Sequence, residues 1–175
     1  MIRKIFIELD RFTWFLRFLK YKLLFAKLKG IGYIGKPLFV RGIKNIFIEK
    51  GFGLFPGWRI EISKNSKLII GKNVRIGHGL FIDCTSGSLM IEDSVTISAN
   101  VFIGSSHHII PEKRDKGFKE WKVVGRDVLI GSNTFIGYGA VILPGSKIGS
   151  GCVIGANTVV KGTIKDGAVY TGQKI

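Results

Sequence analysis

The feature that most constrains this chain is a six-residue period of aliphatic side chains across its C-terminal half. The aliphatic positions of six consecutive units are Ile130, Ile136, Ile142, Ile148, Ile154 and Val160. The residues four positions after them are nearly all small: Thr134, Ala140, Ser146, Cys152, Thr158 and Ile164. An α-helix has about 3.6 residues per turn, so a sixfold spacing would scatter the aliphatic side chains around its axis. The period therefore predicts short strands joined by corners.

The same spacing continues toward the N-terminus with interruptions. It places aliphatic residues at Ile70, Ile76, Ile82, Ile91, Ile97 and Ile103, and units near Ile48 and Ile62 are degenerate. Three units of six residues form a three-sided coil of about 18 residues, with the aliphatic side chains stacked inside. Corners in the left-handed backbone conformation suit glycine and asparagine, and Asn73, Asn100, Asn133 and Asn157 stand at such points. We expect an all-β solenoid over residues 31–175, with a clear repeat over roughly residues 60–164.

One long segment interrupts the repeat, at residues 105–123. It is polar and charged, and it contains two adjacent histidines, His107 and His108. A loop of this length in a regular solenoid is typical of a functional segment. We therefore expect residues of the site in this inserted loop.

The first 30 residues form a separate basic and aromatic segment. Residues 2–29 contain eight Lys or Arg residues against Glu8 and Asp10, and Gly30 follows. Spacings of three and four predict an α-helix with an apolar stripe of Phe12, Phe15, Leu16, Leu19, Leu23 and Ala26. This helix either packs on the main domain or a neighbouring subunit, or lies on an anionic membrane with its aromatic residues Trp14, Phe15, Phe18 and Phe25 dipping inward.

Composition restricts the binding partners and the cellular compartment expected for this protein. The formal net charge is +15, which implies an acidic partner such as a phosphorylated ligand, an anionic membrane or nucleic acid. Cys84 and Cys152 match neither a metal motif nor a disulfide framework, so we expect reduced packing residues. No apolar run reaches the length of about 20 residues that a membrane span needs. The prediction is a cytoplasmic protein, peripheral on the inner face of the cell membrane if the helix binds lipid.

The segment VVGRDVLIGSNTFIGYGAVILPGSKIGSGCVIGANTVV, residues 123–160, resembles the hexapeptide-repeat acyltransferases. It is similar to the branch that holds maltose, galactoside and surface-polysaccharide O-acetyltransferases. The resemblance implies a left-handed parallel β-helix, a homotrimer, and acetyl-CoA held between neighbouring prisms without a metal. The stretch KPLFVRGIKNIFIEKGF, residues 36–52, favours the polysaccharide members. The implied acceptor is a sugar of a surface polysaccharide such as lipopolysaccharide, or of its lipid-linked precursor.

The resemblance also implies roles for individual residues. The general base falls on His108, with His107 as its competitor, and Phe135 borders the CoA site. The pantetheine arm would be lined by Gly137, Tyr138, Gly139, Gly155 and Ala156, and the nucleotide end would meet Lys147, Lys161, Lys165 and Lys174. The polar pair near the acceptor falls on His78 and Ser86, where the sugar enzymes have an amide and a carboxylate. A carboxylate near the histidine could fix its tautomer, and the candidates are Asp83, Glu112 and Asp115. Asp83 is also expected on the acceptor side of the site.

These residues suit direct acetyl transfer to a hydroxyl. An imidazole titrates near neutral pH and can take the hydroxyl proton, while backbone N–H groups at Tyr138 and Gly139 could stabilise the oxyanion. Xenobiotic, serine and nucleotide-sugar N-acetyltransferases remain as alternatives on the same fold. A zinc carbonic anhydrase would need three converging histidines, which an adjacent pair plus His78 does not favour. A nucleic-acid binder is disfavoured because the aromatic residues concentrate in the first segment, so we expect no nucleic-acid partner.

Overall fold

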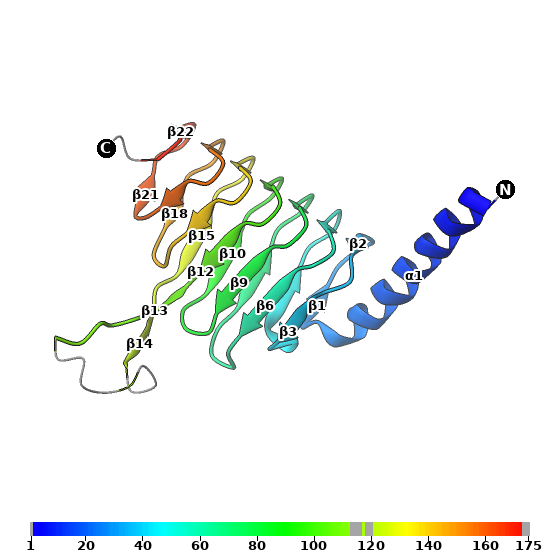
Figure 1. Cartoon of the computed structure of the whole chain (residues 1–175), viewed down its shortest axis with the longest axis horizontal. Coiled ribbons are helices and arrows are strands. Elements are labelled where there is room, and N and C mark those ends of the chain that lie inside the picture. The colour runs from blue at the N-terminus through cyan, green and yellow to red at the C-terminus, as the bar shows by residue number, and fades with distance from the viewer. Residues whose placement is uncertain (1, 113–116, 118–120, 173–175) are drawn as a thin grey trace.

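The structure is a computed structural model that describes residues 2–112, 117 and 121–172, with the side chains described from residue 12 onward. It is a left-handed parallel β-helix with one N-terminal helix and one inserted loop (Figure 1). This is the fold class that the sixfold period and the resemblance predict.

Three parallel sheets form the three sides of the prism, and we call them faces A, B and C. Face A contains, in spatial order, β1 (Lys27–Leu28), β4 (Ile46–Ile48), β7 (Leu68–Ile70), β10 (Leu89–Ile91), β15 (Val128–Ile130), β18 (Lys147–Ile148) and β21 (Thr163–Ile164). Face B contains β2 (Tyr33–Ile34), β5 (Gly53–Leu54), β8 (Arg75–Ile76), β11 (Thr96–Ile97), β16 (Phe135–Ile136), β19 (Val153–Ile154) and β22 (Val169–Tyr170). Face C contains β3 (Phe39–Arg41), β6 (Arg59–Ile62), β9 (Phe81–Cys84), β12 (Phe102–Gly104), β17 (Val141–Ile142) and β20 (Val159–Val160).

The aliphatic residues of the repeat point inward and stack from coil to coil. On face B the register aligns one residue of each strand in a single column: Ile34, Leu54, Ile76, Ile97, Ile136 and Ile154. Every member of this column is at most 2% exposed. Because each coil covers the next, the prism has one continuous apolar core.

The corners use the residue types that their backbone requires. The four asparagines named above have φ between 55° and 57°, in the left-handed region. The small residues of the repeat that have a polar side chain bond to the backbone near the corners. Thr134 Oγ1, for example, donates to the carbonyl of Gly149 at 2.9 Å, one coil further on.

The solenoid begins earlier than the recognisable repeat, because β1 and β2 already pair with the next coil. The corner between β3 and β4 contains a short 3₁₀ turn, Ile43–Asn45. Such irregular corners break the six-residue spacing while leaving the strands in register.

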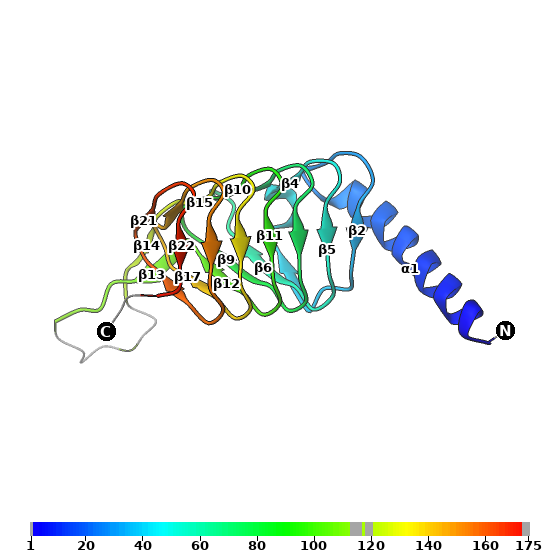
Figure 2. The same cartoon turned by 90° about the horizontal axis from the view of Figure 1, so that it is seen from above.

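The last turns of helix α1 (Ile2–Leu24) close the N-terminal end of the prism, and its first turns extend away from the prism (Figure 2). Phe18, Tyr21 and Phe25 are the buried side chains, and Tyr21 packs on Trp58 with ring centroids 5.7 Å apart. The predicted apolar stripe is wrong as a packing face, since all six of its residues are exposed. The end of the prism presents aromatic rings, and the aromatic side of the helix covers them instead. Within the described part of the chain, no helix has the length and hydropathy needed to cross a membrane.

Candidate active site

The inserted loop leaves the prism at one edge as a two-stranded ribbon. We call the corners that follow face C the C–A edge, and those that follow face B the B–C edge. At the C–A edge, β13 (Ser106–His108) pairs antiparallel with β14 (Val123–Gly125), which aligns His107 with Val124 and His108 with Val123. Successive side chains of a strand point to opposite sides. The ribbon therefore carries two half-buried imidazoles directed in opposite senses, so only one of them can face a given cleft.

The imidazole of His107 has a buried nitrogen atom. The Nδ1 atom of His107 is buried and has no hydrogen-bond partner among the described residues. An unpaired buried polar atom is costly in a native structure and calls for a partner from outside the described residues.

A chain of polar side chains links the base of the ribbon to a carboxylate. The Asp83 carboxylate accepts hydrogen bonds from the backbone N–H of Thr85 at 3.1 Å and from its hydroxyl at 2.8 Å. The same Thr85 oxygen lies 2.9 Å from the Ser106 hydroxyl, and Ser105 Oγ donates to the carbonyl of Ser86 at 2.6 Å. Asp83 and Ser86 thus lie at the C–A edge beside the histidines, and Asp83 reaches the ribbon through Thr85.

Thr85 is a site residue that sequence reasoning missed. In the sequence, Thr85 is recognisable only as a hydroxyl residue at a corner. Many repeats have Ser or Thr at corners for structural reasons, so this pattern does not single it out. Of the other two carboxylates considered, Glu112 is exposed on the loop, and Asp115 lies outside the described residues.

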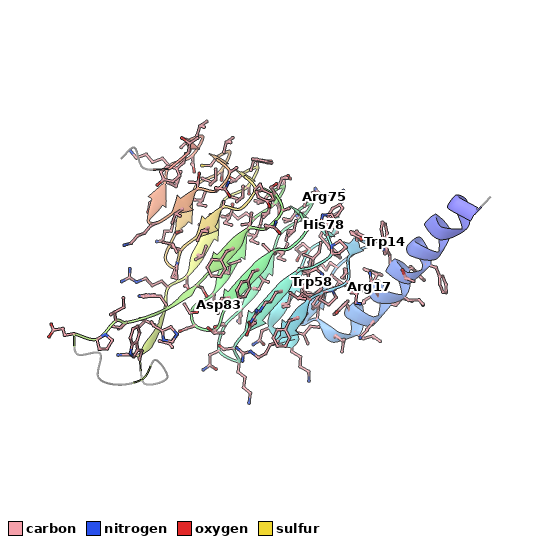
Figure 3. The ribbon with its side chains drawn as sticks, viewed as in Figure 1. Trp14, Arg17, Trp58, Arg75, His78 and Asp83 are labelled. Atoms are coloured by element: carbon pink, nitrogen blue, oxygen red, sulfur yellow. The ribbon has the colours of Figure 1, made fainter. Side chains whose placement is uncertain are left out.

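Apart from the late lysines, the other predicted residues lie along the B–C edge or next to it on face B. His78 is exposed there, in contact with the ring of Phe55 at 5.2 Å, and its carbonyl accepts from the backbone of Asn100. Asn100 Nδ2 in turn donates to the Tyr138 hydroxyl at 2.8 Å. In Figure 3, His78 and Asp83 stand on opposite sides of the prism. The predicted acceptor pair, His78 and Ser86, is therefore not brought together within one chain.

The predicted donor-binding residues share this second edge. They are Phe135, Gly137, Tyr138, Gly139, Gly155 and Ala156, on β16 and β19 or in the corners after them. The stacking of coils already accounts for two of the glycines. A Cβ on Gly137 would lie 2.6 Å from the backbone N of Ala156, and Gly139 has φ of +66°. The Gly139 N–H donates to the carbonyl of Ala99 at 3.0 Å, so it is engaged between coils and cannot stabilise an oxyanion as expected.

The lysines predicted to meet the nucleotide end of CoA are spread around the C-terminal coils and do not gather at one place. Lys147, Lys161 and Lys165 are all exposed, and Lys174 lies outside the described residues. Lys161 also lines a pocket of about 310 Å³ with Asn157 and Thr171. An exposed lysine beside such a hollow suits a phosphate, although it equally suits a solvated surface.

Both cysteines are free and buried, as the sequence predicts. Burial raises the pKa of the Cys84 thiol, and the nearby Asp83 and Asp127 carboxylates act in the same direction. The neutral thiol is therefore the form that this site favours at physiological pH. Among the residues with a described position, no three potential metal ligands cluster, and His78 lies on a different edge from the histidine pair.

Comparison with known proteins agrees with this geometry. Residues 127–162 match the family model described as bacterial transferase hexapeptide (six repeats). The chain is 28% identical over 142 residues to WbbJ of Escherichia coli (strain K12), named a lipopolysaccharide biosynthesis O-acetyl transferase, which covers 78% of this chain and 72% of that protein. It is 32% identical over 110 residues to a galactoside O-acetyltransferase of Lactococcus lactis subsp. lactis (strain IL1403), over 58% of this chain and 50% of that enzyme.

A solved structure of a galactoside acetyltransferase in complex with coenzyme A superimposes with a TM-score of 0.59 at 25% identity. The match covers 83% of this chain and 60% of that one. Prism, inserted ribbon and sequence matches together define a class of left-handed β-helical transferases. Residues 127–162 carry the bacterial transferase hexapeptide repeat, and the chain is similar to the acetyltransferases named above.

Proposed function

We propose that this chain is an acetyl-CoA-dependent O-acetyltransferase that acetylates a sugar hydroxyl of a bacterial surface polysaccharide or of its precursor. The observation that carries the proposal is the histidine-bearing ribbon at the C–A edge of a hexapeptide prism. The names of the similar proteins, a lipopolysaccharide biosynthesis enzyme and a galactoside enzyme, support a sugar acceptor.

The proposed reaction needs one base and no covalent enzyme intermediate. The imidazole of His108, with His107 as the alternative, takes the proton of the acceptor hydroxyl as its oxygen attacks the thioester carbonyl carbon. The carbon–sulfur bond then breaks, and the proton passes from the imidazole to the departing sulfur of CoA. Asp83, Thr85 and Ser106 hold the base of the ribbon, so that the imidazoles keep a fixed direction.

A ring of three subunits explains why the predicted residues occupy two edges. Interfaces around a threefold axis are heterologous, so one edge of a subunit meets a different edge of the next. The donor residues on the B–C edge would then face the histidines on the C–A edge of the neighbouring subunit. Exposed apolar side chains in one column of face B, at Phe135, Val153 and Val169, support such an interface.

The exposed stripe of helix α1 supports a location of the enzyme at a membrane surface. Its apolar stripe is exposed, including Leu23 at 87% and Phe12 at 59%, and the segment around it is basic. An exposed apolar face bordered by Lys and Arg suits the interface of an anionic bilayer. We therefore place the enzyme in the cytoplasm, peripheral on the inner face of the cell membrane, where lipid-linked precursors would be within reach.

The test is CoA release by the purified full-length chain across a panel of acceptors. The panel contains neutral sugars, sugar phosphates, amino sugars and a hydroxyl amino acid at equal concentrations, each with acetyl-CoA. We expect turnover with sugars whose hydroxyl is free and none after that hydroxyl is methylated. Turnover confined to amine acceptors would replace the proposal with N-acetylation, and CoA release that no acceptor stimulates would contradict it.

A further inference from the structure

A pocket of about 850 Å³ opens at the C–A edge, between the histidine ribbon and the helical end of the prism. Its walls are three successive corners of this edge: the corner after β3, the corner after β6, and Thr85 after β9. No residue of the proposed donor site lines it. The pocket therefore adds a second binding region on the same edge as the imidazoles.

Three cationic side chains border the pocket, and the rest of its lining is mostly apolar. Arg41, Lys44 and Lys64 all border it, and they come from two adjacent corners. Arg41 is ion-paired with Glu61 at 3.1 Å, whereas neither lysine forms an ion pair with any residue that the structure describes. Two lysines without an ion pair and a partly neutralised arginine therefore lie around one hollow, and such a group of positive charges attracts a phosphate.

The pocket is held open by the backbone around it. Asn45 Nδ2 donates to the carbonyls of Ser63 at 2.7 Å and of Lys64 at 3.2 Å, which ties the first corner to the second. Gly42 has φ of +75°, and a Cβ there would lie 2.1 Å from the carbonyl oxygen of Ile62. The two corners thus pass each other closely at this point, and the lysines are carried on a fixed frame.

The far wall of the pocket touches the catalytic ribbon through one hydrogen bond. Thr85 lines the pocket, and its hydroxyl lies 2.9 Å from that of Ser106, the residue before His107. Neighbouring coils are about 4.8 Å apart, so the Lys64 corner lies on the order of 10 Å along the axis from the corner that carries the ribbon. A sugar joined through a phosphate or diphosphate spans a similar length from its phosphorus atoms to a ring hydroxyl.

We propose that this pocket holds the phosphate or diphosphate of an acceptor sugar and so presents a hydroxyl of that sugar to the ribbon. The inference rests on the proposed O-acetyltransferase function and narrows its acceptor to phosphate-linked sugars. The order of elements along the prism is consistent with it: helix α1, then β3 and β6, whose corners line the pocket, then the ribbon β13–β14, then the late coils (Figure 1). A lipid-linked sugar diphosphate and a nucleotide diphosphate sugar offer the same chemistry to the pocket.

The test compares Lys44→Ala, Lys64→Ala and the double variant with a matched control, Lys50→Ala, an exposed lysine on a corner between faces A and B. The KM and kcat are measured for one sugar in three forms: free, linked to a nucleotide diphosphate, and linked to a short polyprenyl diphosphate in detergent. We expect the KM for both diphosphate forms to rise by on the order of tenfold per lysine, because each substitution removes a charge-assisted contact. The kcat, the KM for acetyl-CoA, and all constants of the Lys50→Ala variant stay within about twofold of wild type.

The outcomes separate this inference from the proposed function. A wild-type enzyme that acetylates the free sugar as well as the diphosphate forms overturns the phosphate site and leaves O-acetylation intact. So does a double variant whose KM rises equally for free and phosphorylated sugar. No transfer to any sugar overturns both proposals. The diphosphate form with the higher kcat/KM identifies the source of the acceptor.

Discussion

At the residue scale, the chemistry depends on which of two adjacent imidazoles faces the reacting hydroxyl. Their positions on β13 direct them to opposite sides of the ribbon, so they cannot share the task. We predict that His108→Ala lowers kcat by about 10²–10⁴-fold, the usual contribution of a general base, with a smaller change in KM. We predict that His107→Ala lowers kcat by less than about tenfold.

Steady-state CoA release measures both variants, and circular dichroism checks that each keeps its β structure. Retained turnover in His108→Ala together with loss in His107→Ala would reassign the base to His107. Near-normal turnover in both variants would remove the imidazoles from the mechanism.

The Cys84 thiol makes the stability of the folded protein depend on pH at alkaline values. Its pKa is raised in the folded protein by burial, while a thiol in the unfolded chain titrates near about 8.5. The folded state therefore binds its proton more tightly, and this contribution to stability is full below about pH 8.5 and is lost as the pH rises through the folded pKa. We predict that the free energy of unfolding falls above pH 8.5, and that Cys84→Ala shows a shallower fall.

Urea unfolding at several pH values between 7 and 10 measures this slope. Cys152→Ala controls for the loss of a buried cysteine side chain at another place in the core. An identical slope in wild type and Cys84→Ala would show that other groups cause the alkaline loss.

The sequence predicted the core residues better than the site residues, for a geometric reason. A core position depends only on the sixfold spacing, and Ile130, Ile136 and Ile142 are all fully buried as expected. The edge on which a polar residue falls depends instead on which strand precedes it. His78 follows a strand of face B and Ser86 follows a strand of face C, so a similar corner position places them on different edges.

At the scale of elements, helix α1 has two apolar sides with different consequences. The aromatic side closes the prism, where Tyr21 packs on Trp58 and Arg17 donates to the carbonyl of Ile34 at 3.2 Å. We predict that Tyr21→Ala lowers the free energy of unfolding by about 2–4 kcal/mol, as expected for truncating a large buried side chain. We predict that Leu23→Ser changes it by less than about 0.5 kcal/mol, because that side chain is exposed.

The exposed apolar stripe should govern lipid binding instead. In co-sedimentation with anionic phosphatidylglycerol vesicles, Leu23→Ser combined with Phe15→Ser should bind more weakly than wild type, with unchanged urea stability. Equal sedimentation of wild type and the double variant would leave the exposed side without a role at the membrane.

The helix shows what periodicity can and cannot establish. Spacings of three and four correctly predicted a helix at the start of the chain, but they did not determine which side packs. The deciding partner, the end of the prism with Trp58 and Tyr33, lies in coils whose irregular corners hide the repeat. Long-range packing of this kind is not encoded in local spacing.

At the scale of the whole molecule, the central claim is that one site is built from two edges of neighbouring subunits. The proposed donor residues lie on the B–C edge and the histidine pair lies on the C–A edge, so in this account a single prism does not bring them together. A threefold ring joins unlike edges at every interface, so it supplies three complete clefts.

Mixed trimers test this claim most directly. One partner is the double variant His107→Ala with His108→Ala, which keeps the B–C edge. The other is Ala156→Trp, which puts an indole on the exposed donor edge and keeps the ribbon. Each variant alone should be inactive and should have three times the 19.4 kDa mass of one chain.

The two variants are co-expressed with different tags, purified through both tags in succession, and assayed for acetyl transfer. Every doubly tagged trimer contains both variants, so about one third of its clefts, one of the three, receives two intact edges. The account predicts that the doubly tagged trimers regain a substantial part of the wild-type rate. Mixed trimers as inactive as their parents would contradict a site shared between subunits.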